Sequence, residues 1–326
     1  SRAELAEGWE LACQTLVKSD TVVYVPQQEA IERGLTSEKR ASEEITLPFV
    51  CDWQEPLQIE RRFVAIEPPS LADNTTDLSR LKRELSRQHG IRDLTASLPM
   101  LRRLARALRD ADWQVTVVLE TGNGIAPCPV PRLLDLRPGK RDGPLYGAAI
   151  DIGTTSNVVY LVDLEKKIVI DSASAYNAQI SCGEDVISRI IYARRPGGLE
   201  RLQSLVIQTL NGLLTELSQR NRVDLEEIYR VTVAGNTTMI HLFLGLDPAF
   251  IRLEPYIPTL NHPLPVAAYE LGLKVAPEAT VDCLPSVGAY VGGDITAGVL
   301  SSGMFRTDKL TLFIDIGTNG EIVLGN

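Results

Sequence analysis

Two stretches of the chain share one pattern of apolar and polar positions. Residues 148–155 read AAIDIGTT and residues 312–319 read LFIDIGTN, and a second apolar run follows each of them, at 158–162 and 322–324. An apolar run, a short polar segment and another apolar run are typical of a β-hairpin with a tight turn. The sequence therefore predicts two hairpins of the same design, far apart in the chain.

The turn of each predicted hairpin carries residues suited to phosphate and metal binding. Gly153 and Gly317 let backbone N–H groups come close to an anion, and the threonines beside them add hydroxyl donors. Asp151 and Asp315 stand at the strand ends, where a carboxylate can hold a divalent cation directly or through water. Because the same residues also occur in ordinary turns, two purely structural hairpins are the alternative. The paired occurrence favours a nucleotide phosphate chain and its Mg²⁺ held between the two turns.

Patterning divides the rest of the chain into parts. Residues 1–26 combine a helical start with a short strand, and residues 27–54 are polar without clear periodicity, as expected of a linker. Residues 55–144 predict a small α+β domain with a βααβ pattern and a Gly/Pro-rich exit at 122–144. Its predicted strands lie at 57–66 and 113–119, and its amphipathic helices at 77–88 and 96–111.

From residue 145 to residue 326 strands alternate with helices, which predicts an α/β domain. Leucines and valines recur at helical spacing over 199–219, the clearest helix of the chain. The other predicted elements are the hairpin at 147–164, a strand at 168–175, a helix at 183–193, a strand at 229–233, a helix at 239–244, a strand near 281–284, a small-residue helix at 290–302, and a second hairpin from 310.

Composition narrows the class of protein. The 326 residues are 44% apolar and 23% charged with a mean hydropathy near zero, and the longest apolar runs are too short to cross a membrane. A net charge of −9 disfavours a broad nucleic-acid-binding surface. The five cysteines are scattered without a CxxC pair, and the first residues lack the apolar core of a secretory signal. We therefore expect a cytoplasmic protein that binds neither nucleic acid nor membrane.

Four segments in order resemble one protein family. Paired hairpins with helices and strands between them are the arrangement of the actin, sugar-kinase and chaperone ATPase superfamily, which has a ribonuclease-H-like fold. Within it, residues 150–155, 183–190, 234–239 and 315–322 are similar to the C-terminal domain of the reductive activators of corrinoid proteins. Residues 8–14, reading GWELACQ, resemble the last segment of a plant-type 2Fe–2S ferredoxin domain.

The resemblance implies an activity, cofactors and partners. Such an activator returns an oxidised Co(II) corrinoid protein to Co(I), with an electron passed through a 2Fe–2S cluster and with ATP assisting the transfer. The partners would be the corrinoid protein and a reductant or electron-donor protein, and a homodimer is possible. Cys13 would be the fourth cluster ligand, and Asp151 and Asp315 would serve catalysis and hold Mg²⁺. The nucleotide-binding residues would be Gly153, Thr154, Thr155, Gly235, Asn236, Thr237, Gly317, Thr318 and Asn319.

Two predicted helix starts allow either a structural or a functional role. Asp294 lies near the start of the 290–302 helix, where sugar kinases of the superfamily place a catalytic Asp, so it could orient a water molecule. Its alternative role is to favour the helix dipole. Asn236 and Thr237 follow a strand and open a helix; they could cap that helix or face bound phosphate.

The chain departs from the family pattern in two places. The other three cluster cysteines are missing from it, and a 2Fe–2S cluster needs four ligands. The segment that follows the second hairpin in the superfamily is also missing. We therefore expect an inactive fragment: a ferredoxin remnant, the family's middle domain at 55–144, and an actin-like ATPase domain that is incomplete at its C-terminus. A small-molecule kinase and a nucleotide-dependent scaffold or regulator remain alternatives.

Overall fold

The computed structural model describes residues 57–122, 127–317 and 320–325, all within one compact unit. The predicted ferredoxin remnant with Cys13 and the predicted linker at 27–54 lie outside these residues. Among the helices that are described, none combines the length and the apolar character needed to cross a lipid bilayer.

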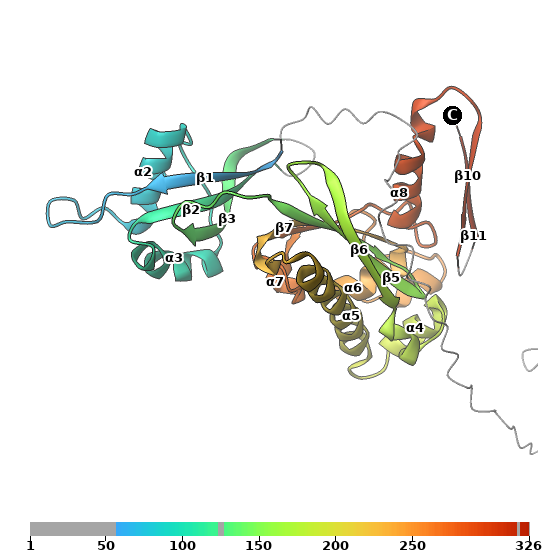
Figure 1. The fold of residues 1–326 in the computed structure, drawn as a ribbon. Helices are drawn as coiled ribbons and strands as arrows, with labels where there is room; N and C mark the ends of the chain where they lie inside the picture. Colours follow the sequence, from blue (N-terminus) through green and yellow to red (C-terminus); the bar gives the residue numbers. More distant parts are fainter. Residues whose placement is uncertain (1–56, 123–126, 318–319, 326) are drawn as a thin grey trace, which may run out of the picture. The chain divides into compact units, whose positions relative to one another are not determined.

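Residues 57–143 form a three-stranded antiparallel sheet packed against two helices (Figure 1). The strands are β1 (Ile59–Ala65), β2 (Gln114–Gly122) and β3 (Pro127–Pro138), and the helices are α2 (Asp77–His89) and α3 (Leu98–Asp110). Both helices begin at a hydroxyl side chain, Thr76 or Ser97, that accepts a hydrogen bond from a backbone N–H in the first turn. The leucines on the inner face of each helix share one core with Val115 and Val117 of β2.

The sequence prediction for this domain missed β3. We expected a Gly/Pro-rich exit over 122–144, whereas the backbone of Pro127–Pro138 pairs with β2. Proline cannot donate to a sheet ladder and is therefore tolerated mainly on edge strands. β3 is such an edge, because the strand order is β1-β2-β3. The buried Leu133, Leu134 and Leu136 anchor it to the core.

Residues 146–283 are built on a six-stranded mixed sheet with the order β6-β5-β4-β7-β9-β8. β4 pairs antiparallel with β5 and parallel with β7, and β7 runs parallel to β9. The first hairpin, the third strand and the long helix are confirmed close to their predicted bounds. The strands are β4 (Tyr146–Ile152), β5 (Ser156–Asp163), β6 (Ile168–Tyr176), β7 (Ile228–Gly235), β8 (Val266–Ala267) and β9 (Thr280–Cys283).

Helices cover this sheet (Figure 1). Helix α5 (Gly198–Asn221) packs against β5 and β6, and its leucines, buried at helical spacing, belong to the largest apolar core. The shorter helices are α4 (Val186–Ala193), α6 (Thr237–Leu244) and α7 (Ala268–Leu271). The predictions did not include α7 and β8, which are only four and two residues long.

The second hairpin is also confirmed, as β10 (Thr311–Ile316) and β11 (Gly320–Gly325). Helix α8 (Gly293–Ser302) precedes it, and the ring of Phe313 lies against Gly298 of this helix. Alternation along a strand places Phe313, Asp315 and, across the pair, Glu321 on the face toward α8. The opposite face exposes five large apolar side chains, those of Leu312, Ile314, Ile316, Ile322 and Leu324.

Candidate functional site

Carboxylates from both hairpins influence one another. Asp151 lies near the end of β4, and although solvent reaches it, protein surrounds most of the carboxyl group. This burial, together with the negative charges of Asp294 and Asp315, raises the pKa of Asp151 to about 6. The charges of the three predicted catalytic aspartates, from β4, α8 and β10, therefore act on one another in the folded structure.

The electrostatic environment of Asp294 fits the same picture. Partial burial and the charge of Asp315 raise the pKa of Asp294, while the backbone N–H of Ile295 donates to Asp294 Oδ1 at 2.9 Å and opposes that rise. The carboxylate lies in the first turn of α8, where the helix dipole favours negative charge. A half-buried carboxylate facing other carboxylates is costly in the absence of a counter-charge.

Glu321 joins this group, although we did not predict it as a site residue. It lies directly opposite Asp315 in the register of β10 and β11. Burial and then the charges of Asp294 and Asp315 raise the pKa of Glu321. Like charges placed opposite each other destabilise a sheet, so a cation between them would be stabilising. The signal was present in the sequence, because Glu321 is part of the motif that follows Asp315.

The turn between β4 and β5 is tight. The Gly153 N–H donates to the Ser156 carbonyl oxygen at 3.0 Å. A Cβ atom at Gly153 would lie only 2.5 Å from that oxygen, so no other residue fits without moving the backbone. The predicted need for glycine here thus arises from a close backbone approach.

The two threonines of this turn differ in environment. Thr154 is buried, and its Oγ1 accepts a hydrogen bond from Asn236 Nδ2 at 3.1 Å. Thr155 is exposed. The hydroxyl of Thr154 therefore connects the turn to the start of α6, whereas the side chain of Thr155 is the one directed to the surface.

Asn236 serves two structural purposes. Its Oδ1 accepts from the Met239 N–H at 2.9 Å and caps α6, while its Nδ2 binds Thr154. Glycines allow close contact around it: a Cβ at Gly235 would lie 2.8 Å from the Ile152 carbonyl oxygen, and one at Gly292 would lie 2.3 Å from Asn236 Cα. The ends of β4 and β7 and the start of α8 therefore meet through bare backbone.

Residues at the starts of α6 and α4 also have structural partners. Thr237 is buried and its Oγ1 donates to the Gly288 carbonyl oxygen at 2.6 Å. Asp185 caps α4, because its Oδ1 accepts from the Ser188 N–H at 2.7 Å. Capping thus accounts for Asp185, and Thr237 ties α6 to the segment before α8.

The remaining predicted site residues carry less structural information. Gly317 is exposed, with open space around the position of a Cβ. Thr318, Asn319 and Cys13 lie outside the described residues. Across the residues that are described, no three His, Cys, Asp or Glu side chains are arranged as a metal cluster. Mg²⁺ usually keeps several waters and takes only one or two carboxylates, so a site built on Asp151 and Asp315 agrees with this.

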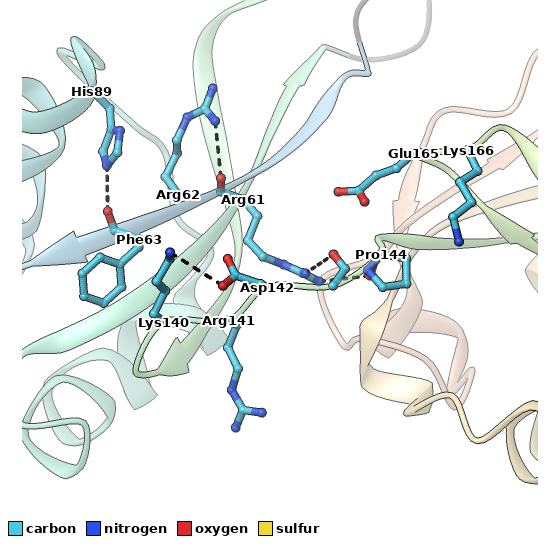
Figure 2. Close-up of a pocket in the computed structure, with 11 residues that line it drawn as sticks. Arg61, Arg62, Phe63, His89, Lys140, Arg141, Asp142, Pro144, Glu165 and Lys166 are labelled. Atoms are coloured by element: carbon cyan, nitrogen blue, oxygen red, sulfur yellow. Dashed lines mark hydrogen bonds and ion pairs between the residues drawn. The ribbon is translucent and has the colours of Figure 1, made fainter.

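A separate hollow of about 710 Å³ is lined by residues of β1, of the segment between β3 and β4 and of the turn between β5 and β6 (Figure 2). Its cationic side chains are largely engaged locally: Arg61 donates to the carbonyl oxygens of Gly143 and Pro144, and Lys140 lies 3.7 Å from Asp142. None of the residues that we predicted from the sequence as site residues lines it. This hollow is therefore not the candidate site.

Comparison with known proteins places the chain in a family. The RACo linker region matches residues 57–143, and the RACo middle region matches residues 146–307. The chain belongs to the RACo family. Within this family the term "middle region" applies to residues 146–307, so the small α+β domain at 55–144, which we expected to be the middle domain, corresponds to the linker region.

Individual relatives agree with the RACo assignment. The chain is 39% identical over 197 residues to the corrinoid activation enzyme RamQ of Eubacterium limosum, covering 60% of this chain and 33% of that protein. It is 23% identical over 192 residues to the [Co(II) methylated amine-specific corrinoid protein] reductase of Methanosarcina barkeri, covering 55% of this chain and 34% of that protein. The chain thus spans about a third of the length of these curated relatives.

A solved structure supports the fold. A reductive activator for corrinoid, iron-sulfur protein matches with a TM-score of 0.69 and 43% identity, covering 82% of this chain and 42% of that one. Together with the mixed sheet order, this confirms the α/β, actin-like ATPase fold expected for RACo proteins.

Proposed function

We propose that this chain is the nucleotide-binding part of an ATP-dependent activator that reduces a corrinoid protein from Co(II) to Co(I). The observation that carries the proposal is the convergence of Asp151, Asp294 and Asp315 beside the Gly153 turn. The raised pKa values of Asp151 and Asp294, to which the charge of Asp315 contributes, indicate that this group needs a positive counter-charge, which the Mg²⁺ of a nucleotide complex would provide. The names of the relatives, a corrinoid activation enzyme and a corrinoid protein reductase, support the substrate class.

The residues of the site would divide the work. The backbone N–H groups of residues 153–155 would bind phosphate oxygens, and Asp151 and Asp315 would hold Mg²⁺ through water. When bound, Mg²⁺ neutralises phosphate charge and so favours attack on the terminal phosphate. Asp294 would orient the attacking water, and Asn236 would keep Thr154 and the start of α6 in register with the turn.

ATP binding would promote reduction by changing how well the activator fits the oxidised corrinoid protein. Binding of the triphosphate between the β4–β5 and β10–β11 hairpins would draw these elements together and change the surface offered to the oxidised corrinoid protein. Cys13 would supply one of the four thiolates of a 2Fe–2S cluster that carries the electron. An electron-donor protein or reductant would be the second partner. The cytoplasmic location and the homodimer stay predictions.

The test is a reduction assay with the full-length protein. Co(II) corrinoid protein and a reductant are mixed with and without ATP, and Co(I) is followed by its absorbance. We expect Co(I) to accumulate only with ATP. In Asp151→Asn, ATP should no longer cause Co(I) to accumulate. Asp142→Asn, an exposed carboxylate of the linker region, is the matched control and should behave as the unaltered protein.

Two results would argue against the proposal. ATP that leaves both the affinity for the corrinoid protein and the rate of its reduction unchanged would remove the coupling. Phosphoryl transfer to a small polyol, without Co(I) formation, would instead favour a small-molecule kinase.

A further inference from the structure

One buried arginine of the middle region forms no ion pair within the described part of the chain. Arg189, on α4, is fully buried, as is Arg80 in the linker region. Arg80 follows the usual rule for a buried charge, because its guanidinium is 2.7 Å from the Asp73 carboxylate. Among the described residues, no carboxylate lies within ion-pair distance of Arg189.

Every contact of the Arg189 guanidinium is with a neutral acceptor. It donates to the carbonyl oxygens of Thr154 at 2.6 Å and Gly183 at 2.9 Å, to Gln179 Oε1 at 3.4 Å, and to Met239 Sδ at 3.2 Å. Burial lowers the pKa of Arg189 to about 10, so the group stays charged at neutral pH. A full positive charge is thus held directly behind the Gly153 turn; the charge of Asp185 acts on it and partly opposes the fall in its pKa, but the two side chains do not form an ion pair.

The contacts also set the direction of the peptides in the turn. Asn177 Nδ2, which is buried, donates to the Gly153 carbonyl oxygen at 2.9 Å, and Arg189 holds the Thr154 carbonyl oxygen. In a trans peptide the C=O and the following N–H point in opposite directions. Two inward carbonyls therefore direct the N–H groups of Thr154 and Thr155 away from the interior, as in a backbone nest for an anion.

We propose that Arg189 is a positioning residue for phosphate binding: it orients the Thr154–Thr155 peptide toward the ligand, and its own charge is balanced by the nucleotide phosphates. This inference rests on the proposed nucleotide site. It assigns a role to the second half of the motif at 183–190, beyond capping of α4. The ligand group that these N–H groups would bind is a polyphosphate. The nucleoside would not contact them.

The experiment compares ATP with adenosine, which lacks phosphates, using calorimetry on the full-length protein with Mg²⁺. Arg189→Met should weaken ATP binding by about tenfold or more, as expected for a lost charge-assisted hydrogen bond. Adenosine affinity should change less than about twofold, because the N–H groups that Arg189 orients would bind phosphate, which adenosine lacks. Arg194→Met, an exposed arginine at the end of the same helix, is the control and should leave both affinities unchanged.

A second variant covers the case in which Arg189→Met does not fold. Arg189→Lys keeps the charge but loses the planar fork, so the ratio of ATP to adenosine affinity should fall only in part. The inference would be overturned if the variants kept the ATP-to-adenosine affinity ratio of the unaltered protein, whether both affinities were unchanged or both fell equally. The proposed function would remain intact. If the unaltered protein binds no ATP, the proposed function fails and the inference fails with it.

Discussion

The Asp151 carboxyl makes the proposed Mg²⁺ site sensitive to pH near neutrality. Its pKa is raised from 3.8 to about 6, and a metal binds only the ionised form. Magnesium affinity should therefore fall as pH drops from 7 to 5. In the absence of metal, the free energy of unfolding depends on pH in the opposite direction. The folded state holds the Asp151 proton more tightly than the unfolded chain does. The stability that protonated Asp151 contributes is therefore lost as pH rises through about 6.

Magnesium titrations of the nucleotide complex between pH 5 and pH 8 check this. Asp151→Asn should give weaker affinity with a flatter pH profile. A midpoint near pH 4 in the unaltered protein would show that neither burial nor the charges of Asp294 and Asp315 raise the pKa of Asp151.

A pair of buried asparagines provides a sharp stability test. Neither amide atom of Asn157 has a hydrogen-bond partner in the described part of the chain, whereas Asn177 accepts from the Gln179 N–H and donates to the Gly153 carbonyl oxygen. Asn157→Val should be neutral or raise the free energy of unfolding by about 1 kcal/mol, since no bond is lost. Asn177→Val should lower it by about 2 kcal/mol, because it strands buried polar groups. Urea unfolding of both variants measures the difference, and equal losses would contradict the expectation.

His241 should make the stability of the protein fall in acid. The buried ring contacts the Thr237 carbonyl oxygen through Nδ1 at 2.7 Å and accepts the Thr259 N–H at Nε2, so it is neutral. Burial lowers the pKa of His241 below 6.5. Between that lowered pKa and 6.5 the unfolded chain binds the proton more strongly, so stability is lost as pH falls below 6.5. Urea unfolding at pH 7.5 and pH 5.5 should show a smaller pH effect in His241→Gln, and an identical effect would refute this.

At the scale of elements, the packing of α8 on β10 should control the site. A Cβ at Gly298 would lie 2.2 Å from the Phe313 ring, so Gly298→Val must push the hairpin away from the helix. Because Phe313 and Asp315 share one face of β10, the displacement should carry Asp315 from Asp151 and Asp294 and weaken ATP binding. Adding Phe313→Ala should restore part of the affinity by removing the clash, and calorimetry on the single and double variants measures this. A double variant no better than Gly298→Val would rule out steric displacement as the cause.

Elements were predictable where local pattern and final environment agree. The hairpins at 147–164 and 310 onward and the leucine-rich α5 follow from periodicity, because each buries one face. Strand β3 did not follow, because its prolines are ordinary loop signals and only its edge position makes them acceptable. The same distinction applies to the candidate site. Asp151 and Asp315 stand in a repeated motif, whereas Arg189 and Asn177 act on the turn through contacts between residues distant in the sequence.

At the scale of the whole molecule, buried charges join the linker region to the middle region. Glu120 of β2 is buried and contacts Arg132 at 3.0 Å, Arg230 of β7 at 2.8 Å and the Thr280 hydroxyl at 2.6 Å. Glu278 is also buried and accepts from Ser97 at the start of α3. The buried carboxylates keep these partners only while both regions are folded and in contact. The two regions should therefore unfold as one cooperative unit.

Glu120→Ala removes a carboxylate that contacts both arginines. It should lower the free energy of unfolding by about 2 kcal/mol, less than the roughly 3–5 kcal/mol typical of a fully buried pair, because Arg132 stays partly exposed. It should also split thermal unfolding, measured by calorimetry, into two transitions, since each region keeps its own apolar core. Glu165→Ala, an exposed carboxylate after β5, should retain the single transition of the unaltered protein. A single unshifted transition in Glu120→Ala would mean that the shared apolar contacts of Ile59, Val118 and Leu134 with the middle region are sufficient to couple the two regions without the charges.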